Sequence, residues 1–394
     1  MNDDAGGAPL VFLVVGEHSG DALGASLMAG LLAKTDGGVR FAGIGGPKML
    51  AAGLERSLFP MTDLAVMGVF EVLPRLPLLL RRMQETADEI LRVQPDVVVT
   101  IDAPDFCFRV VKKLRAAGGA APVVHYVAPS VWAWRPGRAA KVAKFLDHLL
   151  CLLPFEPPYF HREGLDATFV GHPVVSAGFA HGDGEAFRSR HGVPADAPLL
   201  LLLPGSRTGE VSRLLPVFGD TVARLMAQFP GLRVAIPAVD HLRERIRADT
   251  RSWPIAVAVV GAEEKHDAFA AATCALAASG TVTLELAMAG VAHAIAYRVN
   301  ALTGVIGKWL IKTPFANLLN IVLGREAIPE YIQDDCTPDN LARELARLLG
   351  DAGARLRQLE GAREALAHFE PDGVAPGERA ADVVLSVMKK GKMP

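Results

Sequence analysis

The segment LLLPGSRTGE, residues 201–210, combines residue types that can bind an anion. The five leucines Leu199–Leu203 predict a strand that is buried on both faces. Ser206 and Arg207 follow at the carboxyl end of this strand, where open α/β sheets bind their ligands. Backbone N–H groups at the start of the next helix, beside a guanidinium, would form a phosphate site. The alternative is an ordinary strand-to-helix turn with a solvated arginine, and we favour the anion site.

A second segment of this kind is SGTVTLE, residues 279–285, which follows another predicted strand and opens a helix. Gly280 and Thr281 can donate N–H and hydroxyl groups to a diphosphate. Glu285 lies one turn further on and could accept a hydrogen bond from a sugar hydroxyl. The alternative is a capped helix with a surface glutamate.

A carboxylate that could act as a general base follows the apolar strand predicted at residues 94–101. Two candidates, Asp102 and Asp105, lie in the same short loop, whose freedom Pro104 limits. An aspartate here can also cap the following helix. We assign the chemistry to Asp102 and the cap to Asp105.

Two further turns predict the wall of an acceptor site. The first β–α turn, GEHSGD at residues 16–21, lacks the dinucleotide spacing GxGxxG. Its glycines indicate either close backbone approach to a polar ligand or a tight turn with positive φ. The loop HYVAPSVWAWR, residues 125–135, suggests a pocket wall, and the basic residues from 135 to 144, spaced by three, suggest an anion patch on a helix face. For Lys141 and Lys144 a solvated flank is favoured. The acceptor-side candidates are Gly16, Glu17, Ser19, Trp132 and Arg135.

Residues 61–83, MTDLAVMGVFEVLPRLPLLLRRM, are unusually apolar, but Pro74 and Pro77 interrupt them. We expect the prolines to prevent this segment from spanning a bilayer. It could lie on a membrane surface with leucines inserted and arginines near phosphates, or it could form a pair of core helices. The candidate membrane contacts are Met67, Val69, Phe70, Leu73, Leu76, Leu79, Leu80, Arg81 and Arg82.

Length and composition predict two α/β domains. The chain has 394 residues, of which 51% are hydrophobic, and a mean hydropathy of +0.27. A net charge of −2 argues against nucleic acid as a partner. The four cysteines form no CxxC pair, and the acidic start is unlike a signal peptide, which together favour a cytoplasmic protein. Strands are predicted at 9–15, 39–44, 94–101, 123–127, 146–152 and 167–170, and then at 199–203, 234–236, 255–260, 275–278 and 292–296.

This strand–turn–helix rhythm is typical of doubly wound parallel sheets. We therefore expect two facing Rossmann-like domains, at residues 1–175 and 176–365. Residues 175–196 have the composition of a linker. Residues 366–394 are expected to form a helix that packs back on the first domain.

With these motifs in hand, the chain resembles the lipid-A-disaccharide synthases. The matching segments run in family order over most of the chain and include GEHSGDALGA, MGVFEVLPRLPLLL, IDAPDF, VHYVAPSVWAWR, LPFE, LLPGSRTGEV, SGTVTLE and LGREAIPE. The resemblance implies an inverting glycosyltransferase of GT-B architecture. It would join UDP-2,3-diacylglucosamine to 2,3-diacylglucosamine 1-phosphate, giving a β-1,6-linked disaccharide phosphate and UDP. It also implies no metal or organic cofactor and a peripheral position on the inner face of the inner membrane, and it leaves a homodimer open.

The resemblance assigns roles to individual residues. Asp102 matches the aspartate of the family's IDAPDF, Ser206 and Arg207 match the donor-binding GSR, and Glu285 matches the glutamate near the ribose. Asn320 is matched to the asparagine of the family's Pro-Asn-Leu-Leu-Ala segment, which puts Leu319 where the family has proline. Other departures from the family pattern are Cys107 for asparagine, His18 for alanine and Ala128 for serine.

Two other functions stay open from the residues alone. A sugar-nucleotide epimerase could use the same two-domain scaffold, but it would not need the apolar segment 61–83. A non-catalytic nucleotide- or lipid-binding protein would keep Arg207 and the glycine turns without needing Asp102.

Overall fold

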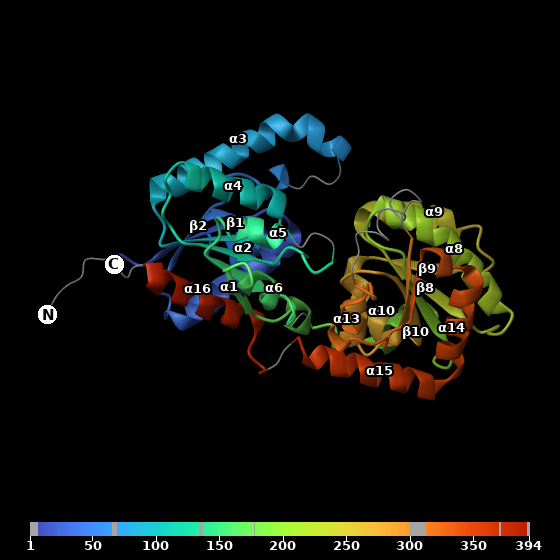
Figure 1. Ribbon diagram of the computed structural model, residues 1–394. Helices are drawn as coiled ribbons and strands as arrows, with labels where there is room; N and C mark the ends of the chain where they lie inside the picture. Colours follow the sequence, from blue (N-terminus) through green and yellow to red (C-terminus); the bar gives the residue numbers. More distant parts are fainter. Residues whose placement is uncertain are drawn as a thin grey trace. The chain divides into compact units, whose positions relative to one another are not determined.

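The chain forms two α/β units, each built on a six-stranded parallel sheet, in the computed structural model shown in Figure 1. The structure describes residues 7–64, 69–133, 137–176, 178–298, 313–369 and 372–391. The first unit comprises Met1–Pro173 with Phe369–Pro394, and the second comprises Val174–His368.

The first sheet has the strand order β2-β1-β3-β4-β5-β6, and all of its neighbouring strands are parallel. Its strands are β1 (Leu10–Val15), β2 (Arg40–Ile44), β3 (Val97–Ile101), β4 (Val123–Tyr126), β5 (His148–Cys151) and β6 (Asp166–Phe169). The central strands are apolar along their whole length because helices cover both faces of the sheet. The chain leaves β1 for β2 on one side and later returns to β3 on the other, so the order reverses between β1 and β3.

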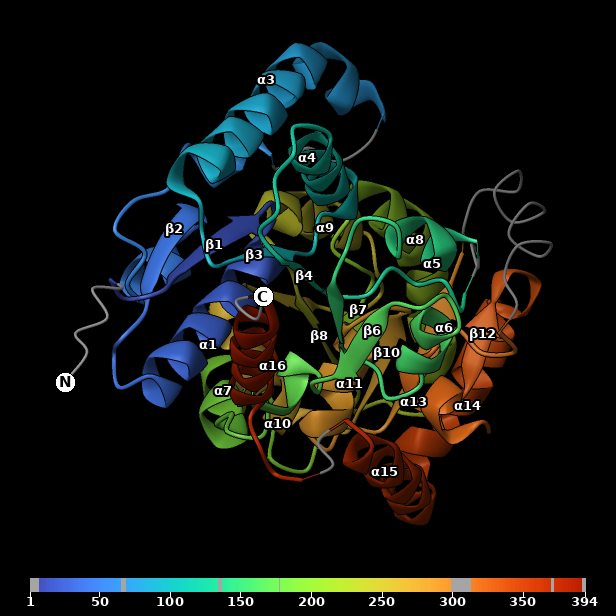
Figure 2. The same ribbon diagram turned by 60° about the vertical axis from the view of Figure 1, so that its left-hand side comes forward.

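Alternate residues of these strands point into two separate cores. One core is covered by α1 (His18–Lys34), α2 (Pro47–Ala51) and α16 (Pro376–Gly391), and the other by α3 (Val69–Val93), α4 (Pro104–Ala116), α5 (Arg138–Val142) and α6 (Pro157–His161) (Figure 2). α16 packs closely on α1: a Cβ placed on Gly30 would lie 2.6 Å from the carbonyl oxygen of Gly377. The last helix of the chain therefore completes the core of the first unit.

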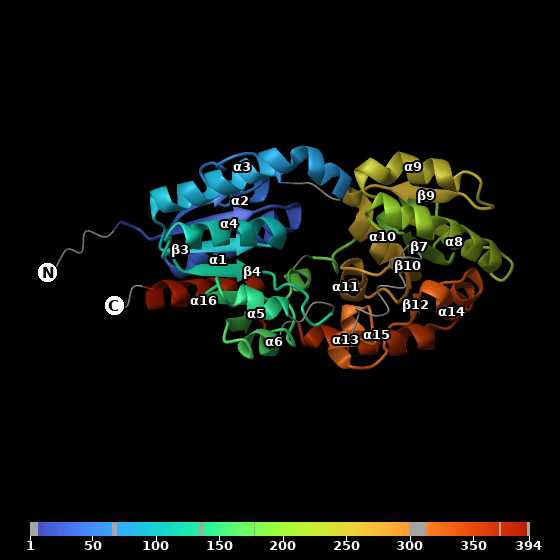
Figure 3. The same ribbon diagram turned by 45° about the horizontal axis from the view of Figure 1, so that its top comes forward.

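The second sheet has the order β12-β11-β10-β7-β8-β9, again all parallel, and reverses between β7 and β10. Its strands are β7 (Leu199–Leu203), β8 (Arg233–Pro237), β9 (Val257–Val260), β10 (Cys274–Ala278), β11 (His293–Tyr297) and β12 (Glu330–Ile332). One face is covered by α8 (Thr208–Met226), α9 (Asp240–Thr250) and α14 (Pro338–Gly350), and the other by α7 (Gly184–Arg190), α10 (Lys265–Ala271) and α11 (Val282–Met288) (Figure 3). Shorter connections and the remaining helices are η1 (Met61–Asp63), η2 (Pro173–Ser176), η3 (Ala262–Glu264), η4 (Gln333–Asp335), α13 (Leu318–Leu323) and α15 (Ala352–Ala367).

The doubly wound α/β fold predicted from the sequence is confirmed, and two local predictions are wrong. Residues 175–196 are not simply a linker, because they contain α7, whose Phe187 is fully buried. The side chain of Asp183 caps this helix by accepting a hydrogen bond from the Ala186 N–H at 2.8 Å. A single buried aromatic among polar residues left too little periodicity to predict the helix.

The second wrong prediction concerns Pro74 and Pro77, which do not interrupt the apolar segment. α3 runs through both of them as one helix of 25 residues. Pro77 is solvent-exposed, so water can bind the carbonyl group that its missing N–H leaves without a helical partner. The alternative of two core helices is therefore also wrong. In the described part of the chain, no helix is both long and apolar enough to cross a membrane.

Candidate active site

The polar turns singled out in the sequence lie where each sheet reverses its strand order. In the first unit, Ser19 lies in the first turn of α1, which follows β1, and Asp102 follows β3. In the second unit, Arg207 follows β7 and Gly280 follows β10. Ligands of open α/β sheets bind at this point, because the loops there diverge and leave a crevice.

A cavity of about 390 Å³ opens at this point in the second unit, which is large enough for a nucleotide-sized ligand. Turns after β7, β8 and β10 line it, together with the start of α10. Five of the six predicted donor-site residues lie together on its wall: Ser206, Arg207, Gly280, Thr281 and Glu285. The structure thus brings two segments that are about 75 residues apart in sequence to one site, as parallel strands require.

Arg207 precedes α8, and its side chain is 65% exposed. Its Nη1 donates to Oε1 of Glu210 at 2.7 Å, and its backbone N–H donates to Oε2 of the same residue at 3.3 Å. A Cβ on Gly205, which has a φ of +106°, would lie 2.4 Å from Glu210 Oε2, so this position requires glycine. An exposed ion pair of this kind contributes only about 0.2–1 kcal/mol, so the guanidinium can exchange Glu210 for an anionic ligand.

Glu285 lies on α11 and forms an ion pair with Lys265, the first residue of α10. Lys265 also lines the cavity, and the sequence analysis did not identify it. Lys265 is not part of a sequence motif. It reaches the site because the start of α10, after β9, contacts α11, after β10.

Asn320 is placed differently from the prediction. It is fully buried and does not line the cavity. Its Nδ2 donates to Ile328 O and to Glu330 Oε1, both at 2.7 Å, and its Oδ1 accepts from the N–H groups of Ala327 and Ile328. Because these bonds use its full hydrogen-bonding capacity, the prediction that Asn320 binds the donor directly is wrong.

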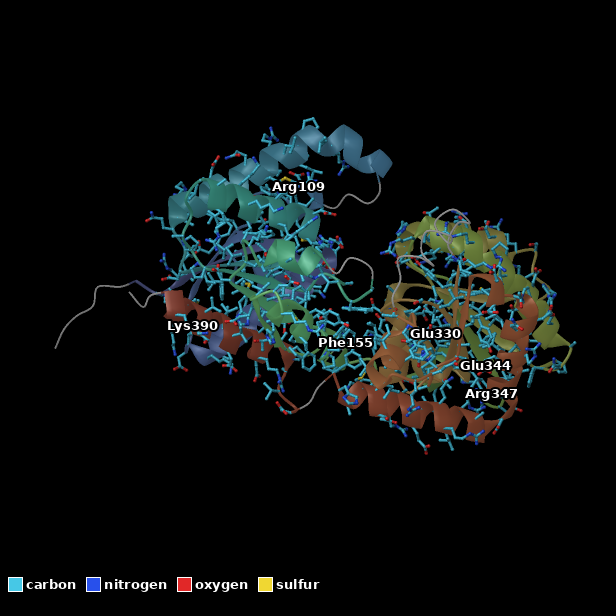
Figure 4. The ribbon with its side chains drawn as sticks, viewed as in Figure 1. Arg109, Phe155, Glu330, Glu344, Arg347 and Lys390 are labelled. Atoms are coloured by element: carbon cyan, nitrogen blue, oxygen red, sulfur yellow. The ribbon has the colours of Figure 1, made fainter. Side chains whose placement is uncertain are left out.

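The asparagine beside the cavity turn is Asn317. Its Oδ1 caps α13 by accepting from Leu319 N–H at 3.1 Å, and it also accepts from Thr283 Oγ1 at 3.2 Å. Glu330, labelled in Figure 4, accepts from the Asn317 N–H at 3.0 Å and so fixes this turn from β12. Asn317-Leu318-Leu319 reproduces the Asn-Leu-Leu of the family's segment, with Ala316 at the proline position. The match of Asn320 to the family's asparagine is therefore three residues out of register. Leu319 therefore does not stand at the proline position.

Asp102 lies at the corresponding edge of the first sheet. Its Oδ2 accepts from Ser19 Oγ at 3.0 Å, and its Oδ1 accepts from the Ala103 N–H at 2.9 Å. The predicted residues Ser19 and Asp102 are thus brought together from two different turns. Asp105 does not cap α4: it is the second residue of the helix, its side chain is 98% exposed, and Ala103 occupies the N-cap position. The Asp105 side chain points into solvent and makes no cap hydrogen bond.

Three residues at this edge have positive φ although none is glycine: Asp102 at +55°, Ala103 at +41° and Val127 at +83°. Positive φ is especially unfavourable for a β-branched residue such as valine. The neighbouring strands hold these residues in place, since Asp102 N–H donates to Tyr126 O and Val127 N–H donates to Leu150 O. Backbone strain of this kind gathers at functional sites, where the surrounding structure enforces it.

Of the two uses weighed from the sequence for Gly16 and Gly20, the structure excludes the tight turn, and close approach to a polar ligand stays a prediction. Neither has a positive φ, so the explanation by a tight turn is wrong. A Cβ on Gly16 would lie 2.7 Å from Ala103 Cβ, and one on Gly20 would lie 2.9 Å from Val15 Cγ1. Gly16 therefore lets the turn after β1 pack directly against the turn that carries Asp102, and Gly20 lets α1 start close to the end of β1. Glu17 occupies the N-cap position of α1 between them.

Trp132 is held by a buried carboxyl group that the sequence analysis did not single out. Its Nε1 donates to Glu156 Oε1 at 3.2 Å, and its ring meets Phe155, labelled in Figure 4, edge-on at 5.2 Å. Burial raises the pKa of Glu156 to about 7. Arg135 lies outside the described residues. The prediction that residues 135–144 form one basic helix face is wrong, because α5 ends at Val142. Lys141 and Lys144 are exposed, which agrees with the alternative of a solvated flank.

Some of the predicted membrane contacts are exposed, and others are packed or paired within the protein. Met67 lies outside the described residues, and only the backbone is described for Val69, Phe70 and Leu73. On α3, Leu76 is half-buried, Leu80 is 46% exposed and Arg81 is exposed.

Leu79 and Arg82 are not available to lipid, so that part of the prediction is wrong. Leu79 packs against the core of the first unit. Arg82 donates to Asp63 and Glu85, both at 2.7 Å, and its guanidinium lies 4.4 Å from the centre of the Phe59 ring. These contacts occupy its charge within the protein.

Metal ligands do not gather in the part of the chain that the structure describes: no three His, Cys, Asp or Glu side chains are placed to hold one ion. The cysteines, including Cys107, are buried free thiols.

Comparison with solved structures defines the class. The fold is shared with the calicheamicin glycosyltransferase CalG4, at a TM-score of 0.57 and 18% identity, covering 98% of this chain and 99% of that one. It is shared equally with a UDP-GlcNAc 2-epimerase from Neisseria meningitidis, at a TM-score of 0.58 and 12% identity, covering 97% and 100%. Two Rossmann-like units thus give the chain the GT-B architecture, which alone does not separate transferase from epimerase.

Sequence comparison makes that separation. A family model described as lipid-A-disaccharide synthetase matches residues 11–371. The chain is 53% identical to the lipid-A-disaccharide synthase of Rhodospirillum centenum, over 97% of this chain and 95% of that protein. The chain belongs to the lipid-A-disaccharide synthase family, and it is a hexosyltransferase of lipid A biosynthesis.

Proposed function

We propose that this protein transfers 2,3-diacylglucosamine from its UDP donor to the 6-hydroxyl of 2,3-diacylglucosamine 1-phosphate, with inversion at the anomeric carbon. The observation that carries the proposal is the cavity of the second unit, where Arg207, Gly280, Thr281 and Glu285 line one site of nucleotide size.

The donor's UDP occupies this cavity. Arg207 exchanges its exposed bond to Glu210 for the diphosphate, and the N–H groups at the starts of α8 and α11 add further donors. Glu285 accepts from the ribose. Asn317 replaces Asn320 in this scheme, as the residue that fixes the turn after β10 through Thr283.

The acceptor's hydroxyl is activated by Asp102. The oxygen of the acceptor hydroxyl forms the new bond to the anomeric carbon, and the proton of this hydroxyl passes to the Asp102 carboxylate. The bond from the anomeric carbon to the phosphate oxygen breaks, and its electron pair leaves with UDP. Arg207 stabilises the negative charge of the leaving UDP. Ser19 and the Ala103 N–H orient the carboxylate.

The test is disaccharide formation by the purified protein from the two diacylated substrates. Asp102→Asn keeps an oxygen for the Ala103 N–H but removes the base, so turnover should fall by about 10²–10⁴-fold while UDP affinity is retained. Asp105→Asn, in the same loop but 98% exposed, is the matched control and should keep wild-type turnover. Wild-type turnover by Asp102→Asn would reject the assignment, and a wild-type protein that binds UDP without forming product would favour a binding protein.

The acyl chains of both substrates support a peripheral position on the inner face of the inner membrane. α3 offers half-buried Leu76 and Leu78, exposed Leu80, and the exposed cations Arg75 and Arg81. Inserted leucines and arginines at phosphate level give reversible attachment to an anionic surface.

A further inference from the structure

Two ion pairs of different character line the cavity of the second unit. Arg207 and Glu210 lie three residues apart at the start of one helix, and the arginine is 65% exposed. Lys265 and Glu285 join the starts of two helices, α10 and α11, and their side chains are only 26% and 17% exposed. Since water screens the second pair less, it is the more persistent of the two.

Aromatic rings fix the Lys265 ammonium group. Its Nζ lies 5.6 Å from the ring centres of both Phe179 and Phe269. Attraction to two ring faces and contact with a carboxylate together restrict a side chain that is otherwise flexible. Lys265 is therefore a fixed charge in the cavity wall before any ligand binds.

This contact uses only one oxygen of Glu285. Lys265 Nζ contacts Oε2, and Oε2 is buried. Glu285 lines the cavity, so its second oxygen is left for a ligand group that donates a hydrogen bond. A carboxylate held at one oxygen has a defined orientation at the other.

We propose that Lys265 is the positioning residue for nucleotide recognition: by holding Glu285 Oε2, it aims Oε1 at a ribose hydroxyl and makes the cavity selective for ribonucleotides over deoxyribonucleotides. The inference rests on the proposed function, which places UDP in this cavity. Arg207 changes partner when the diphosphate binds, whereas Lys265 keeps Glu285 throughout. Lys265 thus acts through Glu285 and not on the phosphates.

The experiment is titration calorimetry of the full-length protein with UDP and with 2′,3′-dideoxy-UDP. A hydrogen bond to a charged group is worth about 10-fold or more in affinity, so the wild type should prefer UDP by at least that factor. Lys265→Met keeps the aliphatic chain between the two rings but removes the charge, and it should reduce the preference to within about 3-fold. Lys265→Arg should restore it. The matched control is Lys34→Met, which removes an ion-paired lysine of similar exposure in the first unit and should change neither affinity.

Each outcome decides the inference. A Lys265→Met protein that loses affinity for both nucleotides equally and keeps the preference would show that Lys265 binds the diphosphate, which overturns the proposal. A wild type without any preference overturns it as well. A wild type that does not bind UDP at all rejects the proposed function itself. If Lys265→Met does not melt as a folded protein, Lys265→Gln is measured in its place, with the same expectations.

Discussion

Substitution of Gly16 by alanine should slow the enzyme by displacing Asp102. The Cβ added at Gly16 would lie 2.7 Å from Ala103 Cβ, whereas carbon atoms in ordinary contact are about 3.5–4.0 Å apart. One of the two turns must therefore move by about 0.8 Å or more. Ala103 follows Asp102 directly and donates its N–H to that carboxylate, so the movement displaces the base. A displacement of about 1 Å can cost about 100-fold, and we expect turnover to fall by about 10- to 100-fold.

The assay compares three properties of the same protein: the rate of disaccharide formation, UDP affinity by calorimetry, and thermal unfolding. UDP affinity should not change, because the cavity lies in the second unit. Overpacking should lower the free energy of unfolding by about 1–3 kcal/mol. The matched control is Gly231→Ala, whose added Cβ would meet only Pro198 Cδ, at 4.0 Å.

A second substitution makes this reasoning refutable. Ala103→Gly removes the methyl group that the new Cβ strikes, at a residue whose φ of +41° suits glycine. The double variant Gly16→Ala, Ala103→Gly should therefore recover turnover to within about 3-fold of wild type, since residues in contact are energetically coupled. Full activity in Gly16→Ala, or failure of the double variant to recover, would show that contact between the two turns does not position Asp102.

Three further predictions follow from single contacts. Arg207→Ala should weaken UDP binding and turnover together, since a guanidinium on the diphosphate acts in both the ground and transition states; unchanged UDP affinity by calorimetry would contradict this. The double variant Leu76→Ser, Leu80→Ser should float less with anionic liposomes than wild type. The control Leu356→Ser, at a leucine that is 57% exposed on α15, should float like wild type. A folded double variant that floats as well as wild type would exclude α3 as the docking surface. Burial raises the pKa of Glu156 from 4.5 to about 7. The contribution of Glu156 to the free energy of unfolding is therefore fully present below about pH 4.5 and is lost as the pH rises through about 7. The unfolding free energy of Glu156→Gln, relative to wild type, should therefore be about 3 kcal/mol higher at about pH 8 than at about pH 4. Urea denaturation that gives the same difference between variant and wild type at both pH values would refute the shift.

The fold could be predicted from the sequence wherever a strand is buried on both faces. Such strands are unbroken apolar runs, and Leu199–Leu203 is the extreme case. β12 was missed because its residues, Glu330–Ile332, are only half-buried at the edge of the sheet and show no apolar run. The prolines of α3 misled for a related reason: local propensity favours a break there, but packing of Leu79 and Met83 on the core keeps the helix continuous.

The meeting of the proposed donor residues on one cavity wall could be predicted because topology places them there. Strands that run parallel bring their carboxyl ends to one edge, so a motif after β7 and another after β10 must meet there. Lys265 and Glu156 could not be predicted in this way. Each contacts a residue about 20 or more positions away, Glu285 for Lys265 and Trp132 for Glu156, and no periodic pattern encodes such a contact.

The strained turn at Asp102 shows most clearly where sequence reasoning reaches its limit. A sequence pattern predicts positive φ from glycine or asparagine, and none occupies Asp102, Ala103 or Val127. Each costs about 1–3 kcal/mol of strain, which the hydrogen bonds to Tyr126 and Leu150 and the surrounding buried strands offset. In the role that we propose for Asp102, a base that is fixed before the acceptor binds loses no further freedom during the reaction.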